Sequence, residues 1–246
     1  MSYCVALKLT RGLIFMSDTL TNGGVDNISR YPKTFSWGVP GERQIFLATA
    51  GNLATTQAVV STLSEQTKAA DERDPSILHA PTMFQVARIV SHTLSEVIGS
   101  SAPGQQVADS AFSATMILGG QIKSGEMRLY LIYPEGNFIE VSDDNPFFQI
   151  GETKYGRPIL VRAFDPEMEF HDAIKLLMVS FDSTIKANLS VGLPLDIRIY
   201  HKDSLQAADE LRVAEDDPYY QMIARAWGDA LKASLVQLPD FVFDAE

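Results

Sequence analysis

Only one cysteine, Cys4, occurs in the sequence, so no disulfide can form within the chain. The longest uninterrupted apolar runs have four or five residues, whereas a membrane-spanning helix needs roughly twenty. The first residues also lack the basic segment and the long apolar segment of a secretory signal peptide. These absences are typical of a reducing compartment, and we expect a cytoplasmic protein that does not enter a membrane.

Positive charge and histidine are also scarce. Twenty Lys and Arg residues are spread without a cluster and the net charge is −11, which argues against nucleic acid as a partner. The four histidines are not spaced as metal ligands; they are His79, His92, His171 and His201. The sequence also contains no phosphate-binding loop ending in GK[ST] and no GxSxG nucleophile motif. We therefore expect no metal site and no cofactor.

What is present suits one compact globular domain over residues 1–246. The chain is 46% hydrophobic and 21% charged, so it can bury a full core. No internal repeat and no low-complexity segment divides it.

The first eighteen residues carry the pattern with chemical content. Residues 3–9 and 13–16 read as two short strands joined by a turn at residues 10–12. Such a hairpin returns Asp18 to the end of the sheet where Ser2 begins, and Lys33 follows the next loop. Cys4 lies inside the first strand and is expected to pack in the core.

Ser2 combines two functions if Met1 is removed, which its small side chain permits. The new terminus then carries a hydroxyl nucleophile and an α-amine with a reference pKa near 8. The amine can accept the proton of its own Ser2 Oγ, directly or through a water molecule, so no histidine is needed. Taken alone, a second residue is more often an exposed end of the chain, and it is the combination with Asp18 and Lys33 that favours a site.

The rest of the chain alternates strands and helices. Residues 19–32 read as a loop, and strands are predicted at 34–37, 44–50, 111–118, 127–133, 138–141, 147–151 and 195–201. Helices are predicted at 51–69, from 83 onward, from within 152–160, and at 165–187, 203–211 and 218–235. Asp165 is the expected N-cap of the helix ending at Ala187. This order fits an α+β fold with four layers, helix, sheet, sheet and helix (αββα).

These residues resemble the active-site layout of proteasome β-type subunits and of the bacterial HslV peptidase. The resemblance rests on Ser2, Asp18 after Ser17, Lys33, and a strand ending in Ala50-Gly51. The segments VDNISRYPK, ATAGNLATTQ, IGETKYGRPIL and FDSTIKANLSVG are more specifically similar to the bacterial proteasome-type proteases called Anbu, across nearly the whole chain.

The resemblance implies an N-terminal nucleophile (Ntn) hydrolase fold and a role for each matching residue. Ser2 would be the nucleophile, the Gly51 N–H an oxyanion donor, and Lys33, held charged by Asp18, would favour the alkoxide. Gly51 could instead serve only the bend of the chain, and Asp18 with Lys33 could be a structural ion pair.

Several positions depart from the family pattern. Serine replaces the commoner threonine at the terminus, and Glu152-Thr153 stands where the family has a Gly-Ser-Gly turn. Ser190 matches a family serine, but the aspartate expected three residues earlier is Ala187, for which Asn188 or Asp182 could compensate. Ser190 completes the candidate set of Ser2, Asp18, Lys33, Gly51 and Ser190.

Three functions remain open on the sequence. The first is a proteasome-type peptidase that cleaves peptide or amide bonds with Ser2, and the resemblance implies self-association into a ring or a helical homo-oligomer. The second is a catalytically silent assembly subunit of the same fold, which retained Met1 would enforce. The third is an amidase that uses the same serine on a small molecule. Whether an ATP-dependent partner exists stays open.

Overall fold

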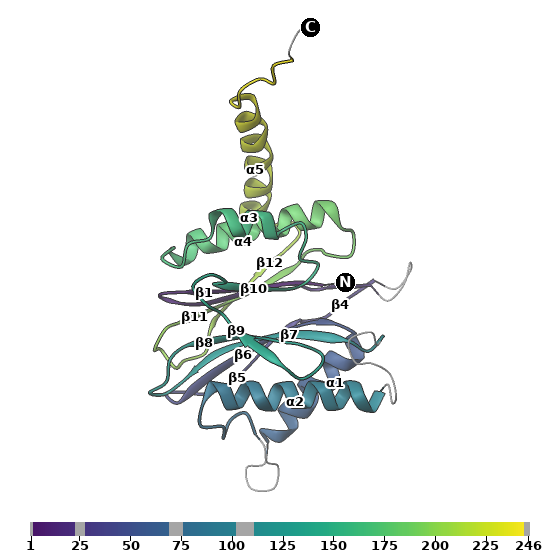
Figure 1. Ribbon diagram of the computed structural model, residues 1–246, viewed down its shortest axis with the longest axis vertical. Coiled ribbons are helices and arrows are strands. Elements are labelled where there is room, and N and C mark those ends of the chain that lie inside the picture. The colour runs from purple at the N-terminus through teal and green to yellow at the C-terminus, as the bar shows by residue number, and fades with distance from the viewer. Residues whose placement is uncertain (1, 23–27, 69–75, 102–110, 244–246) are drawn as a thin grey trace.

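The computed structural model describes residues 2–22, 28–68, 76–101 and 111–243. Two five-stranded sheets face each other, and a pair of helices covers the outer face of each sheet (Figure 1). Helices α1 (Leu53–Gln66) and α2 (Met83–Ser101) form one outer layer, and α3 (Arg157–Ala163) and α4 (Phe170–Ala187) form the other. The predicted αββα sandwich is confirmed.

The first sheet carries the N-terminal hairpin at its centre. Its antiparallel order is β10–β1–β2–β11–β12. The strands are β1 (Tyr3–Leu9), β2 (Gly12–Asp18), β10 (Phe147–Gly151), β11 (Leu195–His201) and β12 (Asp209–Val213). Because β1 and β2 have neighbours on both sides, the start of β1 is fixed within the sheet rather than at its edge.

The second sheet is a meander in the order β5–β6–β7–β8–β9. Its strands are β5 (Thr34–Val39), β6 (Arg43–Gly51), β7 (Ala114–Ile122), β8 (Arg128–Ile132) and β9 (Phe138–Glu140). Between β2 and β5 the predicted loop contains a short hairpin, β3 (Leu20–Asn22) paired with β4 (Ile28–Arg30), which the sequence did not reveal.

Apolar side chains fill the space between the sheets and the space under each helical layer. Alternate residues of β1 and β2 point to opposite sides, so Cys4 and Phe15 lie between the sheets whereas Tyr3 faces α4. The ring of Phe15 lies 5.6 Å from that of Phe46, which lies 5.6 Å from that of Tyr200. These inter-sheet rings bury the apolar faces of both sheets at once.

The segment predicted as a helix at 203–211 is instead the edge strand β12. Residues 209–213 pair with β11 from Leu195↔Val213 to Ile199↔Asp209. Leu211 and its neighbours are good helix formers in isolation, but pairing with an open sheet edge outweighs that weak local preference.

Asp165 is not the N-cap of the helix that ends at Ala187, which corrects the prediction. Asp165 Oδ1 accepts a hydrogen bond of 2.9 Å from Glu167 N, which closes a separate turn. Helix α4 begins five residues later, at Phe170 with Glu169 at its N-cap position, and ends at Ala187 as predicted. An Asp-Pro pair therefore marked a real chain reversal, although not the start of the helix.

The buried stripe of α1 differs in part from the apolar stripe expected. Leu63 is buried as predicted, whereas Leu53 and Val60 are only partly buried and Thr56 and Val59 take the inner positions. Asn52 caps this helix by accepting a hydrogen bond from Thr55 N at 3.1 Å. Ala69, the predicted last residue, lies outside the described residues.

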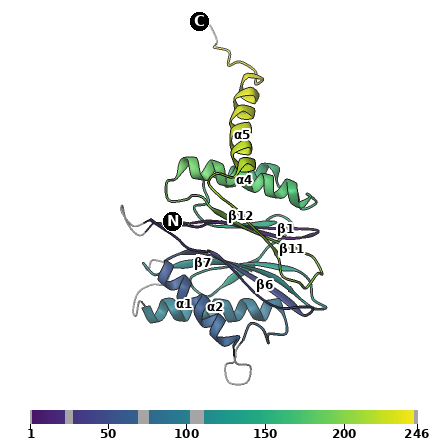
Figure 2. The ribbon, with the colours of Figure 1, turned by 180° about the vertical axis from the view of Figure 1, so that it is seen from behind.

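Helix α5 (Pro218–Val236) projects away from the sandwich, beyond the α3 and α4 layer (Figures 1 and 2). Only its N-terminal part contacts the body, where Tyr220 is buried and Ile223 packs partly buried against the same core. No helix in the described ranges is both long and apolar enough to cross a bilayer.

We expect Phe15→Ala to lower the free energy of unfolding by about 3–5 kcal/mol, because the ring is fully buried between the sheets. Phe84→Ala is the matched control, since 53% of that residue is exposed, and should cost no more than about 1.5 kcal/mol. Urea denaturation of the two variants measures the difference, and equal losses would contradict this view of the core.

Candidate active site

Two neighbours hold the first peptide unit of the N-terminal strand. The Glu152 N–H donates to the Ser2 carbonyl at 2.7 Å, and the Tyr3 N–H donates to Asp18 Oδ1 at 2.9 Å. The register Tyr3↔Gly151 continues this clamp into the sheet. Ser2 is therefore held in place through its own carbonyl and through the N–H of the next residue, Tyr3, and it is not a frayed end of the chain.

Asp18 and Lys33 form a buried ion pair beside this clamp. Lys33 Nζ lies 2.7 Å from Asp18 Oδ1 and also donates to the Leu20 carbonyl at 2.6 Å. Asp18 is 0% exposed and Lys33 is 5% exposed. One carboxylate oxygen thus joins the lysine to the Tyr3 amide, and through it to the start of β1.

Burial raises the pKa of the Asp18 carboxyl above its usual value. The positive charge of Lys33, its hydrogen bond, the Tyr3 N–H and the Gly192 backbone amide each act in the opposite direction and favour the ionised form. The carboxylate therefore depends on its partners to stay charged in this dry position.

Gly51 ends β6 in a conformation that favours glycine, with φ at +121°. A Cβ there would meet the Ser113 carbonyl oxygen at 2.5 Å, so no side chain fits. Asn52 N donates to that same carbonyl, which makes Gly51↔Ala114 a non-hydrogen-bonded pair of the β6–β7 ladder. The Gly51 N–H therefore points away from β7.

The edge of β6 to which this N–H points is the one that faces the Lys33 carbonyl. Two residues earlier, Thr49 N points to the same edge and donates to the Lys33 carbonyl at 2.8 Å. The ideal Cβ position of Gly151 lies 1.9 Å from the Ser2 carbonyl oxygen and 3.4 Å from Ala50 Cβ. Ala50 and Gly51 thus border the place where Ser2 begins.

Ser190 lies in the turn after α4 and is held by Asn188. Its hydroxyl and its N–H both donate to Asn188 Oδ1, at 2.6 and 3.0 Å. Asn188 Nδ2 in turn donates to Glu152 Oε2 at 2.9 Å. Of the two residues considered as substitutes for the missing aspartate, Asn188 contacts Ser190, whereas Asp182 pairs with Lys186 at 2.7 Å.

The structure therefore brings the segments of all five predicted residues to one end of the sandwich. The turn over residues 188–192 reaches Glu152 through Asn188 at one end and lies against Asp18 through Gly192 at the other. Sequence reasoning missed the contact of Glu152 with the Ser2 main chain. The one residue in the sequence that could have indicated this contact is Gly151. It ends β10 with φ at +82° and so turns Glu152 toward the terminus.

Cys4 packs in the core as predicted. It is fully buried between the sheets, its thiol faces the Thr49 carbonyl at 3.5 Å, and burial raises its pKa. A protonated, inaccessible thiol does not act as a nucleophile.

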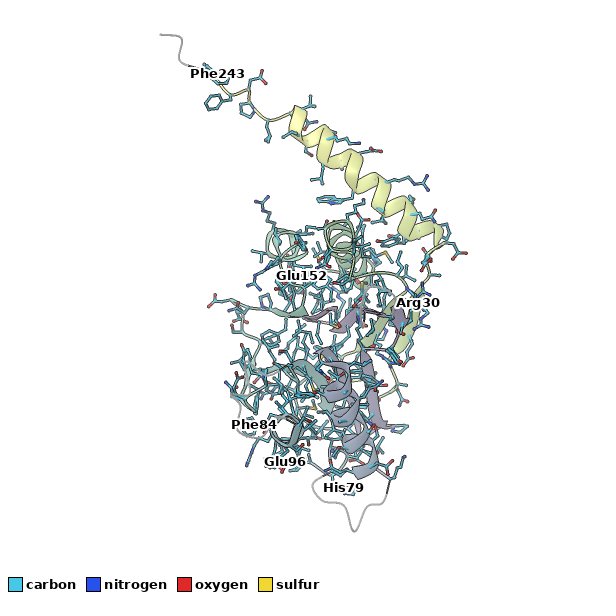
Figure 3. The ribbon with its side chains drawn as sticks, turned by 90° about the vertical axis from the view of Figure 1, so that its right-hand side faces the viewer. Arg30, His79, Phe84, Glu96, Glu152 and Phe243 are labelled. Carbon is cyan, nitrogen blue, oxygen red and sulfur yellow. The ribbon has the colours of Figure 1, made fainter. Side chains whose placement is uncertain are left out.

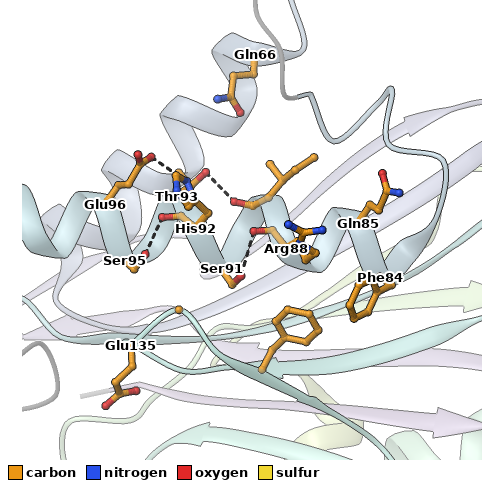
Figure 4. A pocket seen from close by; sticks show the side chains of 13 residues that line it. Gln66, Phe84, Gln85, Arg88, Ser91, His92, Thr93, Ser95, Glu96 and Glu135 are labelled. Carbon is orange, nitrogen blue, oxygen red and sulfur yellow. Dashed lines mark hydrogen bonds and ion pairs between the residues drawn. The ribbon is translucent and has the colours of Figure 1, made fainter.

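A surface groove of about 940 Å³ lies elsewhere, between α1, α2 and the turn from β8 to β9 (Figure 4). Several of its polar side chains are occupied locally: Ser91 and Ser95 hydroxyls donate to carbonyls of α2, and His92 pairs with Glu96. These side chains are therefore engaged within α2 itself. Within the described ranges, no three His, Cys, Asp or Glu side chains are grouped to hold a metal ion.

Comparison with known families places this geometry in context. A model described as Proteasome subunit matches residues 2–198. The chain therefore belongs to the proteasome subunit family.

Solved structures define the branch. The Anbu (ancestral beta-subunit) of Yersinia bercovieri is 42% identical, with a TM-score of 0.90 over 99% of this chain and 100% of that one. An Anbu (Gly-1) mutant from Hyphomicrobium sp. strain MC1 is 45% identical, with a TM-score of 0.91 and the same coverage. The helical assembly of the Anbu complex from Pseudomonas aeruginosa is 42% identical, with a TM-score of 0.91 and again the same coverage. The chain belongs to the Anbu family. No protein with a curated description matches it.

We expect Lys33→Met to lower the free energy of unfolding by about 3–5 kcal/mol at neutral pH, because it leaves the Asp18 carboxylate buried without its cation. The pKa of Asp18 should rise further in the variant. The folded variant then keeps a proton that the unfolded chain releases near pH 4, so its unfolding free energy should fall as pH rises from that value.

Urea denaturation of the variant and the wild type at pH 5 and pH 8 measures this effect. The double variant Asp18→Asn/Lys33→Met is the control and should lose the added pH dependence. If Lys33→Met and the wild type change equally with pH, the proposed dependence of Asp18 on Lys33 is wrong.

Proposed function

We propose that this protein is an N-terminal nucleophile hydrolase that cleaves amide bonds with Ser2 after removal of Met1. The observation that carries the proposal is the clamp on the first peptide unit, in which Asp18 joins the Tyr3 N–H to the buried Lys33. Met1 itself lies outside the described residues. Membership of the Anbu family supports the class of enzyme, and the residue roles are argued from the geometry.

The mechanism begins at the free α-amine. The neutral amine takes the proton of Ser2 Oγ while the oxygen attacks the substrate carbonyl, and a tetrahedral oxyanion forms. The Gly51 N–H, which points away from β7, donates to the oxyanion. Collapse breaks the amide bond as the α-ammonium protonates the leaving amine, and an acyl-enzyme ester remains. The amine then takes a proton from water, which hydrolyses the ester and restores Ser2.

Lys33 lowers the free energy of the developing alkoxide through its positive charge, and its field favours the neutral, basic form of the α-amine. Asp18 keeps that lysine charged and in place, since both side chains are buried. Ser190 lies in the neighbouring turn, where its hydroxyl can orient the terminal amine. The substrates are peptides or small-molecule amides, and the proposed residues would cleave the amide bond of either class by the same steps.

A serine-reactive sulfonyl fluoride should add one adduct to the purified protein, because Ser2 has its own base. Intact-mass spectrometry reads both the adduct and the presence of Met1. Ser2→Ala should abolish the adduct, and Lys33→Met should slow its formation by about 100-fold or more. Ser100→Ala, a change on exposed α2, is the control and should label normally.

A folded protein that retains Met1 and takes no adduct would contradict the hydrolase and favour the silent assembly subunit. If Ser2 is labelled, screening the protein against peptides and against small-molecule amides would distinguish the peptidase from the amidase.

We further propose that copies of the chain self-associate through α5 into a ring or helical homo-oligomer. The projecting helix and the residues after it expose a series of large apolar side chains; these are Met222, Leu231, Leu235, Val236, Leu238, Phe241, Val242 and Phe243. Figure 3 shows Phe243 far from the sandwich, so the described body of the same copy does not cover it. Exposed apolar surface of this kind marks interaction sites, and the Anbu complex from Pseudomonas aeruginosa forms a helical assembly.

Leu231→Glu/Leu235→Glu should reduce the assembly to smaller species, because these residues, 50% and 69% exposed in the single chain, would carry charge into the interface. Sedimentation velocity gives the size of the species. Lys232→Glu, on the same turn, adds negative charge without removing apolar surface and should leave the size unchanged. An unaltered distribution in the double variant would exclude α5 as the contact.

A further inference from the structure

Glu152 is a buried carboxylate next to the chain terminus that lacks a positively charged partner. It is 8% exposed and follows directly after β10, under the α3 and α4 layer (Figure 3). Its backbone N–H is bonded to the Ser2 carbonyl, and its Oε2 accepts one hydrogen bond, from Asn188. In the part of the chain that the structure describes, no lysine or arginine pairs with it.

Two other buried carboxylates near this end of the sandwich have lysine partners. On β2 and the segment before β5, Asp18 is paired with Lys33 at 2.7 Å. On the last turns of α4, Asp182 is paired with Lys186 at 2.7 Å. Glu152 alone among these three buried carboxylates has an amide side chain as its partner instead of a cation, and an ionised carboxylate in such a position is costly.

A cation becomes available at the required place when Met1 is removed. The new α-ammonium belongs to Ser2, the residue whose carbonyl the Glu152 N–H already holds at 2.7 Å. Glu152 Cα is one bond from that amide nitrogen, and the Ser2 nitrogen is two bonds from the carbonyl carbon, so a glutamate side chain is long enough to reach the amine. A carboxylate close to an amine stabilises its charged form and raises its pKa.

We propose that Glu152 is the counter-ion of the Ser2 α-ammonium and acts as a positioning residue for the terminal amine. The proposal rests on the hydrolase function above and extends it. Lys33 lowers the pKa of the amine and Glu152 raises it, and the two opposing charges keep this base near the working pH, where a general base is most effective.

The turn after α4 sets the direction of the Glu152 side chain. Asn188 binds the carboxylate with its Nδ2 and Ser190 with its Oδ1, so carboxylate, amide and hydroxyl form one connected chain of hydrogen bonds. Ala187 leaves the end of α4 without a carboxylate. Glu152, which directly follows β10, supplies a carboxylate to the same turn through its hydrogen bond with Asn188.

Titration of the Ser2 α-amine tests the proposal without any substrate. In protein labelled with ¹³C-serine, the Ser2 signal is assigned by its absence in Ser2→Thr, and its pH dependence gives the amine pKa. Glu152→Gln keeps an acceptor for Asn188 and removes the charge, so the amine pKa should fall by about one unit. Glu152→Ser removes the charge with a smaller side chain and should give the same fall.

Two control variants separate charge from contact. Glu140→Gln removes a carboxylate on β9 that is paired with Arg128, far from the terminus, and should leave the amine pKa unchanged. Asn188→Ala keeps the Glu152 charge but removes the hydrogen bond that orients it, and should lower the amine pKa by less than Glu152→Gln. An amine pKa equal in the wild type, Glu152→Gln and Glu152→Ser overturns the counter-ion role.

Labelling of Ser2 by the sulfonyl fluoride, followed against pH, distinguishes this proposal from the hydrolase itself. The inflection of the labelling rate should move to lower pH by the same amount, about one unit, in Glu152→Gln. No labelling of the wild type together with a shifted amine pKa would overturn the hydrolase alone. Normal labelling with an unshifted amine pKa would overturn the counter-ion alone, and retained Met1 would overturn both.

Discussion

The hydrogen bonds to Asp18 Oδ1 determine the geometry of this end of the molecule. One buried oxygen accepts from the Tyr3 amide at 2.9 Å and from Lys33 Nζ at 2.7 Å. The first bond fixes the start of β1, and the second fixes the chain that enters the other sheet. Because the carboxylate is fully buried, it stays charged only while both donors are in place. The position of Ser2 relative to the lysine is therefore a property of the whole sandwich.

Much of this arrangement could be predicted from the sequence because it depends on local geometry. A short hairpin necessarily returns Asp18 to Ser2, and continuous runs of apolar, β-forming residues locate β1 and β2 within a residue or two. The position of Lys33 relative to that hairpin followed from family resemblance rather than from the residues alone, since nothing local fixes where a segment after a loop returns.

The errors arose where tertiary contacts outweighed local preference. Leu211 and its neighbours form an edge strand because β11 offers free backbone groups, which residue types alone do not reveal. The role of the Asp165 turn depended on where α4 packs. Glu152 stood out only as a departure from a pattern, and its contacts with Ser2 and Asn188 come from three segments remote in sequence.

The hydroxyl of Tyr3 links the site to the outer helices. It lies 2.8 Å from Ser180 Oγ of α4, and its ring centroid lies 4.5 Å from that of Phe181. The next layer out begins with Tyr220 of α5, buried against α4 beside Asp182. The contacts from Tyr220 to α4 and from α4 to Tyr3 thus form a continuous packed path from the projecting helix to the residue that follows Ser2.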